Sequence, residues 1–251
     1  MTLDYFPPIN TKTPHIKSDY FLACFAFYCI FCVLVSDSQA INEVQYIWGF
    51  VVSLCLVIML LGESNYVRIQ VFIAIIFATL GELFASVYME AYLYQLGTIP
   101  AYVPPGHGMV YLAAMALGRS GLFQKYARQV ALFVLFTGGC WAVWGISGIP
   151  KQADVSGAIL FIIFLLCVWK GRNPMVYLGA FFITSWLELV GTAAGVWNWA
   201  LIDPISGFFQ GNPPSGVAAY YCLVDAIAIG LATPLLLVLK GSLDKFIKNR
   251  Q

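Results

Sequence analysis

Three carboxylic acids lie in the middle of long apolar stretches of the chain: Glu82, Glu188 and Asp225. An acidic residue inside a membrane helix costs about 2.5–3.5 kcal/mol on insertion scales, so it faces the protein interior and marks a functional site by default. The centres of these stretches contain no Lys or Arg that could pair with the acids. We therefore predict that the three carboxyls form a ligand-binding or proton-transfer site. The alternative is a purely structural role, as protonated groups bonding neighbouring helices, with Ser86 and Thr192 as local partners.

Two further groups could take part in proton chemistry. His107 follows the double proline Pro104-Pro105, and Ser215 follows the double proline Pro213-Pro214. His107 could shuttle a proton, or it could serve only as a helix cap or an interfacial side chain. A Ser–His pair with a nearby acid would suggest acyl transfer. Asn212, directly before Pro213, is suited to cap a helix N-terminus whose free amides could face a ligand.

Four aromatic residues follow two of the acids at similar distances along the chain. Tyr92 and Tyr94 come after Glu82, and Trp197 and Trp199 come after Glu188. At about 1.5 Å per helical residue, this spacing puts both acids near the middle of the membrane. The aromatic side chains could line an apolar pocket that binds substrate, or they could belong to the ordinary interfacial belt.

The same features recur in the same order in two halves of the chain, at an offset of about 106 to 109 residues, which indicates an internal duplication. Each unit holds four apolar segments. Because four is an even number, the two units enter the membrane in the same sense, and we predict parallel repeats related by an axis along the membrane normal.

Composition places the protein in a membrane. The chain has 251 residues, of which 61% are hydrophobic and only 10% are charged, whereas soluble domains carry about 25% charged residues. A formal net charge of +1 gives no basic field for nucleic acid, so we expect no nucleic-acid partner. The expected environment is a cell membrane, and the short loops suit a bacterial plasma membrane.

Apolar segments long enough to cross the bilayer number eight, and the predicted fold is an all-α polytopic membrane protein. Placing both termini in the cytoplasm puts twelve of the thirteen Lys and Arg residues on the inner side, with only Lys151 outside. The predicted units are a cytoplasmic segment 1–19, a first repeat 20–125, a second repeat 126–239 and a basic tail 240–251. The predicted spans are 20–36, 47–62, 68–94, 106–118, 127–147, 154–170, 175–199 and 214–239.

No metal and no cofactor is expected. One histidine within the membrane region is too few for a haem, di-iron or zinc site, and no nucleotide-binding glycine loop is present. Chemistry must therefore use the acids, a hydroxyl, one imidazole and backbone dipoles.

These features predict an acid-lined, aromatic-rimmed pocket that opens toward the extracytoplasmic half. It would bind or modify an apolar or amphipathic molecule, such as a lipid or isoprenoid, by proton chemistry. Two alternatives remain: a small proton-coupled carrier, and an accessory subunit that binds a larger membrane protein. The expected partners are membrane lipids, an apolar or amphipathic small molecule and, for the subunit alternative, a membrane protein. The sequence does not decide whether the protein is an enzyme.

Overall fold

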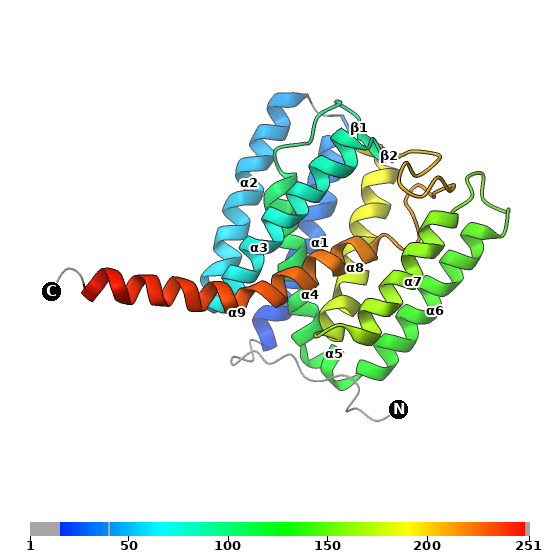
Figure 1. Cartoon of the computed structure of the whole chain (residues 1–251). Coiled ribbons are helices and arrows are strands. Elements are labelled where there is room, and N and C mark those ends of the chain that lie inside the picture. Colours follow the sequence, from blue (N-terminus) through cyan, green and yellow to red (C-terminus); the bar gives the residue numbers. More distant parts are fainter. Residues whose placement is uncertain (1–15, 40, 249–251) are drawn as a thin grey trace.

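A computed structural model describes residues 16–39 and 41–248, so most of the predicted segment 1–19 and the last three residues lie outside the described part. The described chain is mostly helical (Figure 1). Its elements are α1 (Ile16–Asp37), α2 (Asn42–Leu61), α3 (Asn65–Glu82), the π-helix η2 (Leu83–Tyr88), β1 (Tyr92–Tyr94), α4 (Val103–Arg119), α5 (Gly121–Lys125), α6 (Ala127–Ile146), α7 (Val155–Lys170), α8 (Pro174–Ala193), β2 (Trp197–Trp199) and α9 (Ala218–Lys248).

Every predicted apolar segment overlaps one of the long helices, and α5 is a short turn between α4 and α6. Within the described residues, six helical segments are long and apolar enough to cross a membrane: α1, α2, α3 continued by η2, α6, α8 and α9. Helix α7 is also apolar but has only 16 residues. The chain is therefore an all-α, multi-pass membrane protein.

Helix starts use the polar and proline residues of the short connections. The Ser64 hydroxyl accepts a hydrogen bond from the Val67 amide at the start of α3, and the Asp154 carboxylate accepts one from the Gly157 amide at the start of α7. Prolines occupy the first turns of α4 and α8, where the missing amide proton costs nothing.

Two predicted spans extend too far. The segments 68–94 and 175–199 stop being helical at Tyr88 and Ala193, so their aromatic pairs lie on strands and not on helices. The chain reverses after each helix through a residue with positive φ, Glu90 at 54° and Gly195 at 73°. A left-handed residue cannot continue a right-handed helix, which ends both segments early. At the other end, α9 continues to Lys248, beyond the predicted boundary at 239.

Strands β1 and β2 form a two-stranded antiparallel ribbon at one end of the helix bundle (Figure 1). Tyr92 pairs with Trp199, Leu93 with Asn198, and Tyr94 with Trp197. The ribbon thus joins two parts of the chain that are about a hundred residues apart. It lies where α3 with η2 and α8 end.

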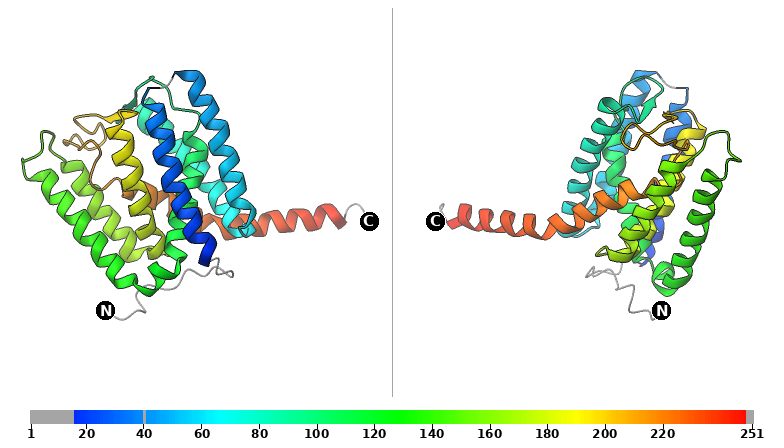
Figure 2. Two further views of the ribbon diagram at one scale, coloured as in Figure 1. Left: turned by 180° about the vertical axis from the view of Figure 1, so that it is seen from behind. Right: turned by 45° about the vertical axis from the view of Figure 1, so that its right-hand side comes forward.

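Helix α4 forms the centre of the bundle and contacts α1, α2, α3 and α8. Its most extensive contact is with α8, where a Cβ added to Gly179 would lie 2.3 Å from the Ala114 carbonyl oxygen. Helix α9 packs most extensively on α3. Around these four inner helices, α1 with α2 and α6 with α7 stand as pairs on opposite sides (Figure 2).

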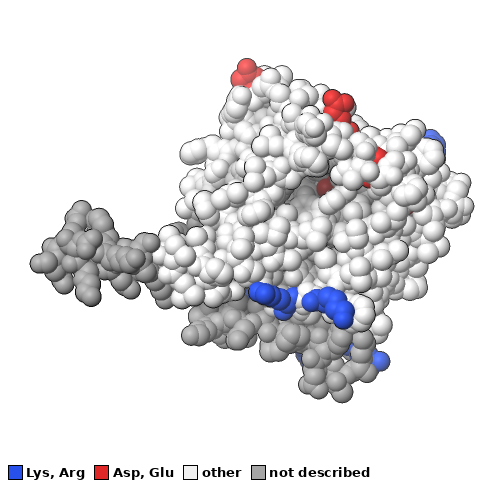
Figure 3. Space-filling view, in the orientation of Figure 1, with Lys and Arg blue, Asp and Glu red and all other residues white. Residues whose placement is uncertain are grey.

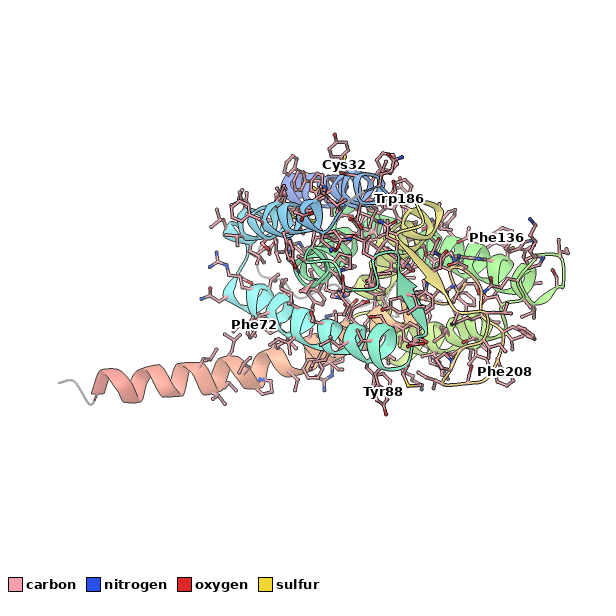
Figure 4. All side chains as sticks on the ribbon, turned by 90° about the horizontal axis from the view of Figure 1, so that it is seen from above. Cys32, Phe72, Tyr88, Phe136, Trp186 and Phe208 are labelled. Atoms are coloured by element: carbon pink, nitrogen blue, oxygen red, sulfur yellow. The ribbon has the colours of Figure 1, made fainter. Side chains whose placement is uncertain are left out.

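The outer surface is apolar around the bundle. Large side chains such as Phe72, Tyr88 and Phe136 point outward when the molecule is seen from the ribbon end (Figure 4). On the face drawn in Figure 3, a broad and mostly uncharged band separates the acidic groups near the ribbon end from most of the basic groups, which lie near the opposite end, while one basic group lies at the right on the ribbon side. Such a band is the surface that a lipid bilayer covers.

Candidate functional site

Glu82 is the last residue of α3 and is buried beneath the ribbon. One of its carboxylate oxygens, Oε1, accepts hydrogen bonds from the Tyr92 hydroxyl at 2.7 Å and the Tyr94 hydroxyl at 2.8 Å. Alternate residues of a strand point to the same side, which lets both phenols reach one acceptor. The helix widens into η2 directly after Glu82, and such π-helical turns are frequent at functional sites.

Glu188 of α8 has the same arrangement in the second half of the chain. Its Oε2 accepts hydrogen bonds from the indole nitrogens of Trp197 at 3.0 Å and Trp199 at 3.1 Å. Each acid is thus held through one oxygen by two aromatic donors of the strand that follows its own helix. The sequence analysis noted that each acid is followed by an aromatic pair, and the structure shows that each pair donates to its acid.

The phenols that hold Glu82 remain donors over the whole physiological range. Burial raises the pKa of the Tyr94 phenol well above its usual value, and the nearby Glu82 charge raises it further. Burial also raises the pKa of Tyr92, again with a contribution from Glu82. Both groups therefore stay protonated and keep donating to the carboxylate.

His107 lies next to the second oxygen of Glu82. Its Nε2 is 3.6 Å from Glu82 Oε2, too far for a good hydrogen bond but close enough for an ion pair if the imidazole is protonated. The two prolines that open α4 set the start of the helix, and His107 follows them in its first turns. The ring of Tyr221, from α9, is 6.3 Å from the His107 ring.

Two cavities share a polar wall made of Glu82, Tyr92, His107, Glu188 and Tyr221. A smaller cavity of about 80 Å³ extends toward α1 and α2, and its other walls include Val33, Val52 and Met109. A larger cavity of about 330 Å³ extends between α3 with η2 and α9, along residues such as Phe84 and Val224. Apart from the shared wall, both cavities are lined mainly by apolar and aromatic side chains.

Of the predicted substrate-binding aromatics, Tyr92, Tyr94 and Trp197 line the smaller cavity, and Tyr92 and Trp199 line the larger one. The predicted local partners of the acids make different bonds. Ser86 and Thr192 donate to the backbone carbonyls of Glu82 and Glu188, one turn earlier, and not to their carboxylates.

Asp225 is not part of this wall. It is buried, but it lines neither cavity and instead lies within electrostatic range of Tyr111 and Tyr177. Ser215 also lines neither cavity, so the structure does not bring it to His107. Its backbone amide donates to Asp154 at 2.7 Å.

The expected capping role of Asn212 is wrong. Helix α9 begins at Ala218, six residues later, because turns occupy the intervening segment. The Asn212 side chain accepts a hydrogen bond from the Trp199 amide and donates one to Asn198. It therefore supports strand β2 from the exposed side.

Three functional positions escaped the sequence analysis. Tyr221 faces both acids, and its only signal is that it lies one helical turn before Asp225. Asp37 accepts a hydrogen bond from the Tyr102 hydroxyl, and Asp154 binds the amides of Gly211 and Ser215. Asp37 holds the segment before α4 and Asp154 holds the segment before α9, and short polar connections give no distinctive pattern for such roles.

The described residues contain no group of three or more His, Cys, Asp or Glu side chains that could hold a metal ion. Comparison of the chain with models of known families, with curated proteins and with solved structures gives no match. Fold and site together define a multi-pass membrane protein with two buried, aromatic-held carboxyl groups between apolar cavities.

Proposed function

We propose that this protein binds an apolar or amphipathic molecule, of lipid or isoprenoid kind, and modifies it by proton transfer. The observation that carries the proposal is the shared wall of two apolar cavities, in which Glu82 and Glu188 are each fixed through one oxygen. The hydrogen bonds of each acid end on that oxygen, so the other oxygen is available to a ligand. Apolar walls with a few convergent polar groups are typical of small-molecule sites.

The two acids suit different steps of one proton transfer. Glu82, with His107 at 3.6 Å, can give or take a proton, because a fixed acid in a water-poor cavity is an effective general acid or base. Glu188, held by two indole donors, is placed to stabilise positive charge that develops on the ligand. The faces of Tyr92 and the two tryptophans would add cation–π attraction.

We further propose that the eight long helices are two parallel repeats of four spans each. The strand register supports this. In the proposed repeats, Tyr92 is equivalent to Trp197, and Tyr94 is equivalent to Trp199. Tyr92 nevertheless pairs with Trp199, and Tyr94 pairs with Trp197, so the pairing is crossed between the two repeats. A twofold axis through the central Leu93 and Asn198 pair generates this exchange. The helix contacts are crossed in the same way. In the proposed repeats α3 is equivalent to α8 and α4 to α9, and α4 packs on α8 while α9 packs on α3.

The proposed orientation places both termini in the cytoplasm and the ribbon on the outer side of a bacterial plasma membrane. The visible distribution of charge supports it, since basic groups gather at the end opposite the ribbon (Figure 3). A proton-coupled carrier is the second candidate, because the two cavities meet at the same acids from different sides of the bundle.

Native mass spectrometry of protein purified gently from its own membranes tests the proposal. We expect a stoichiometric apolar ligand in the wild type and its loss in Glu188→Gln. Glu90→Gln is the matched control, because Glu90 is an exposed acid close to the same ribbon, and this variant should keep the ligand. A co-purifying protein without any small molecule would contradict the proposal and favour an accessory subunit.

A further inference from the structure

A second set of buried polar residues continues from the site into the bundle. On α4, Tyr111 lies one helical turn after His107, and on α9, Asp225 lies one turn after Tyr221. Residues four apart share a face of a helix. The rings of His107 and Tyr221 are 6.3 Å apart, and Tyr111 and Asp225 lie within electrostatic range of each other. His107 and Tyr221 thus lie near each other, and the second pair, Tyr111 and Asp225, lies one helical turn further along both helices.

Each of these groups is deeply buried and has a polar atom without a hydrogen-bond partner in the described part of the chain. Tyr111 is 2% exposed, Asp225 3% and Gln70, on α3, 1%. Among the described residues, no hydrogen bond reaches the Tyr111 hydroxyl, Asp225 Oδ2, Gln70 Oε1 or His107 Nε2. A buried polar atom without a partner costs about 1–3 kcal/mol, and native proteins usually satisfy such atoms with ordered water.

The unpartnered atoms come from helices that pack on one another, because α3 contacts both α4 and α9. Toward the end opposite the ribbon, the line continues through Tyr66, which lies one turn before Gln70 and within electrostatic range of Tyr111. Tyr66 is half-buried in the first turn of α3. The line thus runs from the Glu82 site to a partly exposed group at the far end of the bundle.

On the ribbon side of the two acids, aromatic side chains close the route to the surface. Above the acids lie Tyr92, Tyr94, Trp197 and Trp199, whose polar atoms all point at Glu82 or Glu188. Their rings pack together, with Tyr92 4.5 Å from Trp199 and Tyr94 5.9 Å from Trp197. A packed aromatic layer leaves few polar groups to conduct a proton from the ribbon side.

We propose that Gln70, Tyr111 and Asp225 hold a file of water molecules, which carries protons between the Glu82 and His107 site and the end of the bundle where α3 begins. This inference rests on the proposed proton chemistry, for which the file would be the supply or exit route. In each transfer, Asp225 accepts a proton from one water and releases a proton to the next. The Tyr111 hydroxyl passes protons in the same way, so neither residue changes overall.

Hydroxyl-radical footprinting by water radiolysis tests the file, because buried side chains beside ordered water are labelled and side chains in dry packing are not. The experiment uses the full chain in lipid nanodiscs, with peptides read by mass spectrometry. We expect Tyr111 to be labelled despite its burial. Phe164 is the dry control, since it is fully buried between the rings of Phe161 and Phe181.

Substitutions test whether Asp225 and Gln70 hold the water next to Tyr111. Asp225→Asn keeps a polar side chain of the same shape and should retain the Tyr111 labelling, whereas Asp225→Leu should abolish it. Gln70→Leu provides the same test on another helix if Asp225→Leu does not fold. Labelling of Tyr111 as slow as that of Phe164 in the wild type, or unchanged labelling in both Leu variants, would overturn the proposal.

This test needs no ligand, so it separates the two proposals. Labelled Tyr111 in a protein that carries no small molecule would uphold the water file and refute the proposed function. A dry Tyr111 in a protein with a bound apolar molecule would do the reverse.

Discussion

Glu188 is the residue whose replacement tests the geometry of the site most quantitatively. Glu188→Gln keeps an oxygen that can accept both indole bonds, at 3.0 and 3.1 Å in the wild type. A hydrogen bond to a charged group contributes about 1.5–3 kcal/mol and one between neutral groups about 0.5–1.5 kcal/mol. Over two bonds, replacing a charged by a neutral acceptor in Glu188→Gln should lower the free energy of unfolding by about 2–3 kcal/mol.

Glu188→Leu should be more destabilising, because it leaves two indole N–H groups without an acceptor. Trp197 and Trp199 are only 6% and 8% exposed, so each orphaned donor costs about 1–3 kcal/mol, and the pair about 2–6 kcal/mol. Adding Trp197→Phe and Trp199→Phe removes these donors and should restore part of the lost stability. The stability of each variant is measured in detergent as the midpoint of its denaturant or thermal unfolding. A Leu variant as stable as the Gln variant, or one that the Phe replacements do not rescue, would refute this reasoning.

Three further substitutions test how the site is supported. Gly191→Ala places a Cβ 2.0 Å from the Trp197 ring and should displace the indole from its acid, lowering both stability and ligand retention in native mass spectrometry. Gly81→Ala is its control, since no atom lies within 4 Å, and a midpoint that falls equally would argue against the displacement. Arg119→Ala removes the guanidinium that binds the buried carboxylates of Asp19 and Glu63 and should lower the free energy of unfolding by about 3–5 kcal/mol. An unchanged midpoint would show that these ion pairs are not stabilising. Asp154→Ala removes the acceptor of three backbone amides, so hydrogen exchange should accelerate in residues 211–215, and unchanged exchange would contradict the anchoring role.

The helical part of the fold could be predicted because a membrane helix is marked by its own composition. Each predicted apolar segment overlaps a helix, and the acids were placed on the correct helices. These predictions depend on local patterns: a long apolar run, an acid within it, and aromatics at a fixed distance after it.

Predictions that depended on how distant segments meet were less complete. The reversal at Glu90 requires a left-handed residue that is not glycine, and nothing in the local sequence signals it. The pairing of Tyr92 with Trp199 joins strands of three residues, too short for an alternating pattern. Asp225 was expected with the other two acids, but its depth depends on where α9 starts and how α9 crosses α8.

Transfer of solvent protons to the bound molecule tests the central claim most directly. Membranes that contain the protein are incubated in D₂O, and the apolar molecule that co-purifies is analysed by mass spectrometry. Our account predicts carbon-bound deuterium with the wild type and with Glu90→Gln, and a bound molecule without deuterium with Glu82→Gln, whereas Glu188→Gln should yield no bound molecule. A bound molecule that acquires no deuterium from the wild type, or that acquires it equally in all variants, would contradict proton transfer by these two acids.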